Sequence, residues 1–305
     1  MSKLHEFYML TIIIKNWHDV LLFKLGIKSK ILIETNLNKK IKIKNFREYA
    51  EFWNGYLAAE SKAAFYNKKY NLDIKIKKYF ILFKKFNKSI KLFHGERPNS
   101  ILSLVTENFI EEQYSKLEIK NNIILDIGAN VGDSTIFFAL NGAKKVYALE
   151  PYPHSYNLAR KNVMINKLNK KIILLNAAIG KNKDFYKLDE NFKSFDSSPI
   201  KKFKKGKNIP VYSLSDLVKK FKLINAILKM DCEGFEYESI LTTENSILRK
   251  FSQVFLEYHY SYEDLVKKLR SAGFRVTVTM PVYLYNKNAT DPNMYIGKII
   301  ALRIN

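Results

Sequence analysis

The sequence predicts an α/β fold in which helices cover both faces of a mostly parallel sheet. From residue 121 onward, short apolar runs alternate with segments of helical hydrophobic spacing, which is the pattern of strand–helix–strand units. The seven predicted strands are residues 123–127, 145–150, 172–176, 226–231, 254–259, 274–278 and 297–303. The predicted helices are residues 134–140, 154–165, 214–221, 235–241 and 262–271. Because a long loop instead of a helix joins the last two strands, we expect the last strand to insert antiparallel.

Residues 1–100 lack this alternation and are predicted to form a mainly helical accessory or cap region, followed by the α/β domain at 101–305. Within the accessory region, residues 45–70 carry aromatic and alanine positions at helical spacings. Residues 75–90 are basic and aromatic, a pattern that fits either a strand pair or a short helix. His94-Gly-Glu-Arg-Pro98 marks a turn-rich junction before the second domain.

The composition is that of a folded protein with one large core. The chain has 305 residues, of which 47% are apolar and 14% aromatic, and this argues against disorder. Its one cysteine, Cys232, excludes an internal disulfide and a cysteine-rich metal site, and fits a reducing compartment. The apolar run at 8–14 ends at Lys15, far short of the ~20 residues of a membrane span, and lacks the features of a signal peptide. We therefore expect a cytoplasmic protein without a transmembrane segment.

The formal net charge of +23 has two interpretations. The lysines are spread along the whole chain and interleaved with Ile, Asn and Phe, which favours a solvated basic surface. A basic surface also raises the affinity for phosphate backbones and anionic lipid. Two interactions therefore stay open. One is binding to nucleic acid, and the other is peripheral contact with a membrane, for instance through residues 8–25. The sequence predicts no oligomeric state.

The turn that follows the first predicted strand indicates a nucleoside-binding site. The strand ends at Asp126, and Gly128 lets the chain turn tightly at the edge where open α/β sheets bind ligands. Gly132 allows the backbone to approach a ligand closely. The second strand ends in Glu150, whose carboxylate can accept hydrogen bonds from both hydroxyls of a ribose. The third strand ends in Asn176, whose side chain can bond the exocyclic amine of adenine.

Two other kinds of nucleotide site fit this turn less well. The positions Gly128, Asn130 and Gly132 do not provide the two glycines, three residues apart, that a dinucleotide fingerprint needs. No Gly-Lys-Ser/Thr occurs at the turn, so the motif of a phosphate-binding loop is missing as well. The sequence therefore favours a mononucleoside without phosphates.

The fourth and fifth predicted strands end in acids and an imidazole that are suited to proton transfer. Asp231 and Glu233 follow the fourth strand, and period-2 spacing puts Glu257 and His259 on one face of the fifth. These groups suit a general base that deprotonates a hydroxyl, or a weak site for a divalent metal ion, although no metal is predicted. The open alternatives are that His259 is a structural histidine and that Glu236 is a solvated or structural acid.

Residues from about 107 to 303 resemble the FkbM family of methyltransferases that use S-adenosylmethionine (SAM), and the archaeal members most closely. The resemblance rests on Leu125-Asp-Ile-Gly-Ala-Asn-Val-Gly-Asp-Ser134, Phe138-Ala-Leu-Asn-Gly-Ala-Lys-Lys145, Ala148-Leu-Glu-Pro151, Leu228-Lys-Met-Asp-Cys-Glu-Gly234 and Leu256-Glu-Tyr-His259. It implies the class I methyltransferase fold, a Rossmann-like seven-stranded sheet, with SAM as cofactor and O-methylation of sugar or polyketide hydroxyls. It also implies that residues 107–114 close over SAM, with Tyr114 as the contact.

The residues and the resemblance together define the predicted site. The predicted cofactor-binding residues are Tyr114, Asp126, Gly128, Asn130, Gly132, Ser134, Glu150, Pro151, Asn176, Ala177 and Asp231. The predicted catalytic residues are Asp231, Glu233, Glu257 and His259.

The predicted function is O-methylation of a hydroxyl on a sugar, a glycolipid or another small metabolite. Enzymes that methylate exocyclic amines of bases usually carry an Asn/Asp-Pro-Pro-aromatic run after the fourth strand, whereas Asp231-Cys-Glu-Gly-Phe235 contains no proline. The alternative is a basic RNA-binding or RNA-modifying methyltransferase, in which residues 75–86 supply aromatic rings for stacking and lysines for phosphates.

Overall fold

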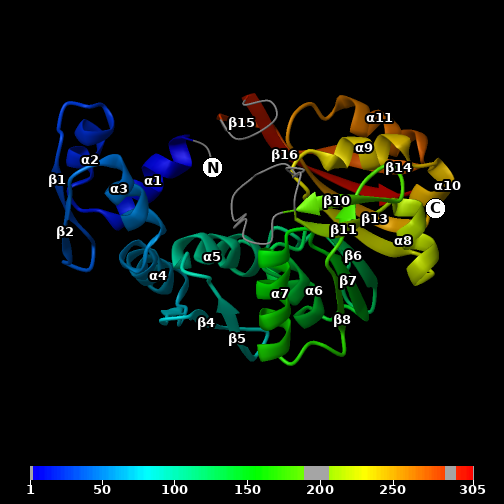
Figure 1. Cartoon of the computed structure of the whole chain (residues 1–305), viewed down its shortest axis with the longest axis horizontal. Coiled ribbons are helices and arrows are strands. Elements are labelled where there is room, and N and C mark those ends of the chain that lie inside the picture. Colours follow the sequence, from blue (N-terminus) through cyan, green and yellow to red (C-terminus); the bar gives the residue numbers. More distant parts are fainter. Residues whose placement is uncertain (1–2, 189–205, 286–292, 305) are drawn as a thin grey trace. The chain divides into compact units, whose positions relative to one another are not determined.

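The computed structural model of the chain describes residues 3–188, 206–285 and 293–304 (Figure 1). The chain divides into two compact units, Met1–Glu112 and Gln113–Asn305. Among the described residues, no helix is long and apolar enough to cross a membrane. The boundary of the cofactor-binding domain near residue 100 stays a prediction.

The second unit contains the predicted α/β sheet. Its strands are β6 (Ile123–Ile127), β7 (Lys145–Leu149), β8 (Ile172–Leu175), β12 (Ala226–Met230), β13 (Phe251–Tyr258), β14 (Phe274–Val278), β15 (Val282–Tyr285) and β16 (Asn293–Arg303). The order across the sheet is β14-β16-β13-β12-β6-β7-β8, and β15 pairs with β16. Neighbouring strands from β13 to β8 are parallel, whereas β16 runs antiparallel to both β13 and β14. The predicted sheet, including its antiparallel last strand, is confirmed, whereas β15 lies in the segment that was predicted to be a loop.

Helices cover both faces of this sheet, which explains why its central strands are apolar without alternation. The helices are α6 (Asp133–Leu140), α7 (Pro153–Ile165), α8 (Leu214–Phe221), α9 (Phe235–Thr242), α10 (Asn245–Leu248) and α11 (Glu263–Ser271). On one face, α8, α9 and α11 share a core with Leu125, Leu228 and Leu256 of the sheet. On the other face, the ring of Tyr114 packs against Phe255 of β13 and Phe138 of α6.

A small second sheet in this unit was not predicted from the sequence. It consists of β9 (Ala178–Ile179), β10 (Asp184–Leu188) and β11 (Lys207–Tyr212), in the order β10-β11-β9. In β10 and β11 only alternate residues are buried, such as Leu188 and Ile209, and Lys187 and Pro210 separate the buried positions. Two buried positions per strand give too weak a signal for prediction. Residues 189–205, which join β10 to β11, lie outside the described part of the chain.

The first unit is mainly helical, as predicted, and also contains two small antiparallel sheets. Its elements are α1 (Lys3–Ile13), α2 (Trp17–Lys24), β1 (Ile31–Glu34), β2 (Lys40–Ile43), α3 (Phe46–Asn54), α4 (Tyr56–Tyr70), β3 (Lys75–Ile76), β4 (Phe80–Lys85), β5 (Lys88–Phe93), α5 (Pro98–Val105) and the π-helix η1 (Thr106–Ile110). The helix predicted at 45–70 is broken at Gly55, which adopts an extended conformation between α3 and α4. Of the two structures that the pattern at 75–90 allowed, strands are observed and the short helix is wrong.

Candidate active site

Backbone hydrogen bonds join the carboxyl ends of four parallel strands into one edge. The amide of Gly128, just after β6, donates to the carbonyl of Leu149 at the end of β7 (3.0 Å). The amide of Glu150 donates to Leu175 at the end of β8 (3.1 Å), and the amide of Asp231 donates to Ile127 of β6 (3.1 Å). The residues that follow these strands are therefore held side by side, at the edge where open α/β sheets bind ligands.

A buried ion pair lies beneath this edge. Asp126 of β6 and Lys229 of β12 are 0% and 2% exposed, and their Oδ1 and Nζ atoms are 3.1 Å apart. The other carboxylate oxygen of Asp126 accepts the hydroxyls of Ser134 (2.8 Å) and Thr135 (2.6 Å) at the start of α6. Because these partners surround the carboxylate, Asp126 positions the turn after β6 and the start of α6. Direct contacts of Asp126 and Ser134 with a cofactor stay predictions.

Lys229 was missed by the sequence analysis, although a lysine within an otherwise apolar strand is a signal. Its ammonium donates to the carbonyl of Gly128 (2.8 Å), in addition to its ion pair. Burial alone lowers the pKa of Lys229, but the nearby carboxylates, Asp126 first, raise it above its usual value. The side chain is therefore charged and ties the tip of β6 to β12.

Glu150 lies at the tip of β7 and is held by backbone amides. Its two carboxylate oxygens accept hydrogen bonds from the amides of Asn130 (2.8 Å) and Tyr152 (2.9 Å). Burial raises the pKa of Glu150 to about 8, although both amide bonds favour the ionised form. Beside it, the side-chain amide of Asn176 donates to the carbonyls of Glu150 (3.0 Å) and Pro151 (2.8 Å). The Oδ1 atom of Asn176 is buried and finds no donor among the described residues, so it can accept a bond from a ligand.

The two glycines of the turn have different neighbours. Both Gly128 (φ +79°) and Gly132 (φ +84°) adopt the left-handed conformation that glycine favours. A Cβ atom on Gly128 would lie 1.8 Å from the carbonyl oxygen of Asp231. A Cβ atom on Gly132 would lie 3.3 Å from the Cα and Cβ atoms of Ala159 on α7. Gly128 therefore allows the tips of β6 and β12 to meet, and the backbone approach at Gly132 is to α7.

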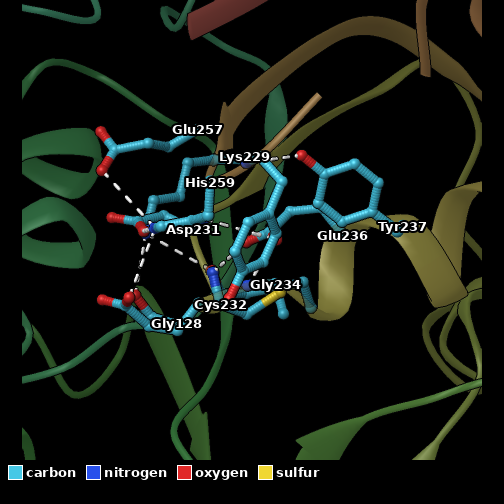
Figure 2. A network of polar contacts seen from close by, with 12 residues as sticks. Gly128, Lys229, Asp231, Cys232, Gly234, Glu236, Tyr237, Glu257 and His259 are labelled. Carbon is cyan, nitrogen blue, oxygen red and sulfur yellow. Dashed lines mark hydrogen bonds and ion pairs between the residues drawn. The ribbon is translucent and has the colours of Figure 1, made fainter. Parts of the chain in front are cut away.

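The predicted catalytic residues form one cluster, of which Figure 2 labels Asp231, Glu257 and His259. The Nε2 atom of His259 lies 3.3 Å from an oxygen of Glu233 and 3.9 Å from oxygens of both Asp231 and Glu257. His259 is buried, whereas the three carboxylates are partly exposed. Burial lowers the pKa of His259, but the surrounding carboxylates, Glu236 first, outweigh it and raise the pKa above its usual value. Glu257 and His259, which are two residues apart in the chain, thus lie on the same side as Asp231 and Glu233, the acids that follow β12.

Glu236 was expected to be either a solvated or a structural acid, and its contacts are those of a structural acid. It is fully buried, and its carboxylate accepts the amides of Cys232 (2.6 Å) and Gly234 (2.8 Å). The same carboxylate lies 3.6 Å from Nδ1 of His259, on the opposite side of the ring from the cluster (Figure 2). Glu236 therefore fixes both the turn after β12 and the orientation of the imidazole. Its sequence signal is only an acid two residues after a glycine turn.

The remaining predicted residues lie in less open positions. Tyr114 is buried against the rings of Phe137, Phe138 and Phe255, with centroids 5.7, 4.8 and 4.9 Å away. Ala177 is buried after the tip of β8. Their contacts with a cofactor stay predictions.

The strand tips therefore provide two adjacent chemical environments. Glu150 and Asn176 offer acceptors for hydroxyl and amine groups, as a nucleoside requires. Around His259, three carboxylates offer proton acceptors or metal ligands. One ligand atom from each of Asp231, Glu257 and His259 can be chosen so that all lie within 4.8 Å of one another.

The family model and the curated relatives that match this chain are those of methyltransferases. The model of the methyltransferase FkbM domain matches residues 126–276. This range includes the ends of the parallel strands and the residues that follow them, from Asp126 to His259. The chain is similar to the tRNA (guanine(37)-N(1))-methyltransferase of Methanocaldococcus jannaschii, with 43% identity over 53 residues, 17% of this chain and 15% of that protein. It is similar to the ribosomal protein L11 methyltransferase of Carboxydothermus hydrogenoformans, with 35% identity over 71 residues, 23% of each protein. These matches span less than a quarter of either relative.

A solved structure of a methyltransferase FkbM from Methylobacillus flagellatus is also similar. It shares 14% identity with this chain, covers 59% of this chain and 43% of its own, and has a TM-score of 0.39.

We expect Gly128→Ala to destabilise the protein by more than the backbone strain of a left-handed alanine, because the new methyl group also clashes with a carbonyl oxygen. The left-handed conformation costs an alanine about 1–2 kcal/mol, and the clash with the carbonyl of Asp231 adds about 1–3 kcal/mol. Gly142→Ala is the matched control, because Gly142 also has a positive φ (+93°) but a Cβ atom there would lie no closer than 3.3 Å to Lys120, at its Cγ atom, and 3.6 Å from its Cα atom. Urea unfolding measures both free energies. Equal losses would show that the β6 and β12 tips do not need this close approach.

Proposed function

Since its domain makes this chain a member of the FkbM methyltransferase family, we propose that it transfers the methyl group of SAM to a hydroxyl of a sugar, glycolipid or other small metabolite. The observation that carries the proposal is the cluster at the ends of β12 and β13, where three carboxylates and an imidazole face one another beside the Glu150 tip. A hydroxyl nucleophile has to lose its proton, and such a cluster can bind the hydroxyl and accept that proton.

The residues at the tips of β6, β7 and β8 fit the nucleoside part of SAM. We assign the two ribose hydroxyls to Glu150, whose carboxylate is already held in place by two backbone amides. The buried acceptor of Asn176 suits the exocyclic amine of adenine, because the described chain offers it no donor. Asp231 suits the cationic methionine end. When bound, SAM supplies the electrophilic methyl group.

In this proposal the β12 and β13 tips position the acceptor. Methyl transfer needs the nucleophile in line with the sulfonium methyl group and little else. Asp231 and Glu233 bind the hydroxyl, and Glu257 accepts its proton. His259, whose pKa the surrounding carboxylates raise, can accept that proton only after its own has moved to one of them. Glu236 contributes by holding the imidazole and the turn, through its contacts with His259, Cys232 and Gly234.

A second candidate function is the modification of RNA, and the β3–β5 sheet favours it. Three lysines there lie over neighbouring aromatic rings: Lys78 over Tyr79 (5.1 Å), Lys85 over Phe86 (5.6 Å) and Lys91 over Phe80 (5.6 Å). Such a surface suits the stacking and phosphate contacts of single-stranded nucleic acid. The similarity to a tRNA methyltransferase over 53 residues points the same way. The turn after Asp231 lacks proline, which keeps hydroxyl methylation as the first proposal.

Incubation with methyl-labelled SAM and a fractionated extract of the source cells tests the substrate class. We expect label in glycan, glycolipid or small-metabolite fractions. His259→Ala is the matched variant, and it should lose the label while it still binds S-adenosylhomocysteine, because His259 belongs to the transfer cluster and not to the Glu150 tip. Label confined to RNA would overturn the proposal in favour of the second candidate.

The raised pKa of Glu150, about 8, predicts that cofactor affinity depends on pH. Only the ionised carboxylate accepts from both ribose hydroxyls, and below the pKa the neutral form predominates. Affinity for S-adenosylhomocysteine should therefore rise by about tenfold or more from pH 6 to pH 8 and level off above it. Calorimetry at several pH values measures this. Glu150→Gln should bind weakly and without that slope, and a flat wild-type profile would remove Glu150 from the cofactor site.

A further inference from the structure

We propose that Asp231, Glu257 and His259 bind a divalent metal ion at the ends of β12 and β13. The proposal that an ion binds rests on the geometry of the cluster alone. What the ion does there rests on the proposed methyl transfer.

The backbone places the three ligands on neighbouring strand ends. β12 and β13 are parallel, with Met230 opposite Leu256, so Asp231 and Glu257 follow paired positions. One ligand atom from each residue lies within 4.8 Å of the other two. Adjacent ligands of an ion with bonds of about 2.2 Å stand about 3.1–3.6 Å apart. The three ligand atoms therefore need to approach one another by about 1–1.5 Å to close on an ion.

The imidazole is oriented as a ligand. Its Nδ1 atom faces the buried carboxylate of Glu236 at 3.6 Å, and Glu236 is itself fixed by two backbone amides. A carboxylate behind a histidine holds the ring so that its other nitrogen faces a metal. Here the other nitrogen, Nε2, faces the three carboxylates of the cluster (Figure 2). His259 is 1% exposed, so neither nitrogen is directed into solvent.

The charges of the cluster also favour a cation. Four carboxylates, those of Asp231, Glu233, Glu236 and Glu257, lie within 4 Å of one imidazole. The Oε2 atom of Glu233 is buried, and its ion-pair partner is the Nε2 atom of His259 at 3.3 Å. The nearest lysine, Lys229, is already paired with Asp126. Even a protonated imidazole balances only one of these negative charges, whereas a divalent ion balances two more.

The ligand set indicates which ions would bind. Mg²⁺ prefers oxygen ligands in near-ideal octahedral geometry, whereas imidazole suits Zn²⁺, Fe²⁺ and similar ions. A ligand set of two carboxylates and one imidazole therefore favours a transition-metal ion such as Mn²⁺ or Zn²⁺. The remaining coordination positions of the ion are left open for water or substrate. Mn²⁺ is the suitable probe because it also accepts carboxylate ligands readily.

On the proposed function, the ion would activate the acceptor hydroxyl. A hydroxyl oxygen bound to a divalent ion loses its proton more easily. The proton would pass to Glu233, the carboxylate of the cluster that is not a ligand. The oxygen–methyl bond then forms as the sulfur–methyl bond breaks, and S-adenosylhomocysteine leaves. Glu257 and His259 would act as ligands instead of proton acceptors.

Calorimetric titration of the full chain with MnCl₂, after dialysis against EDTA and in the absence of cofactor, tests the proposal. We expect one ion per chain, and loss of that binding in Asp231→Asn and in His259→Gln. Glu257→Gln should also lose it. Asp231 and Glu257 are both partly exposed, so their variants disturb the fold less than a variant of the buried His259. Glu238→Gln is the matched control, because Glu238 is an exposed acid on neighbouring α9 outside the cluster, and it should bind like the wild type.

The chain's net charge of +23 disfavours adventitious cations, so a saturable signal is meaningful. Absence of Mn²⁺ binding, or binding that all three ligand variants retain, would overturn the proposal. S-adenosylhomocysteine is titrated in parallel to separate this result from the proposed function. Binding of S-adenosylhomocysteine without Mn²⁺ contradicts only the metal site, and binding of Mn²⁺ without S-adenosylhomocysteine contradicts only the methyltransferase proposal.

Discussion

The ion pair between Asp126 and Lys229 is the contact on which the rest of the site depends. It joins the two central strands of the sheet, and both side chains are almost fully buried. A buried pair of this kind contributes little net free energy, but removal of one partner leaves an uncompensated charge. Asp126 also binds the first turn of α6, and Lys229 binds the carbonyl of Gly128. The glycine turn, the helix and the tip of β12 therefore share one electrostatic anchor.

The two halves of the site are organised by buried glutamates that use the same device. Glu150 on the cofactor side and Glu236 on the transfer side each accept two backbone amides from the turn beside them. The amides fix each carboxylate, and the carboxylate in turn fixes a loop that would otherwise lack partners. Glu150 keeps capacity for a ligand, whereas Glu236 directs its remaining contact to His259. Preorganisation of this kind suits a reaction that depends on positioning.

The sequence predicted the strands of the main sheet and most of the polar residues that follow them. It did not predict contacts between residues on strands that are far apart in the sequence. Alternating apolar runs predicted the strands because both faces are covered, and polar residues at their ends predicted the site. The roles of Lys229 and Glu236 depend on partners in β6 and β13, which no local pattern specifies. The strands β9–β11 have too few apolar positions for a periodic signal, and the break at Gly55 has a helical sequence on both sides.

A double-mutant cycle on Asp126 and Lys229 tests the central claim most directly. Lys229→Met alone should lower the free energy of unfolding by about 3–5 kcal/mol, because it leaves the Asp126 carboxylate buried and unpaired. Asp126→Asn combined with Lys229→Met should cost clearly less than the sum of the two single changes, since neither charge remains. Urea unfolding of the four proteins gives the coupling. Costs that add to within about 0.5 kcal/mol would contradict the claim that this pair anchors the site.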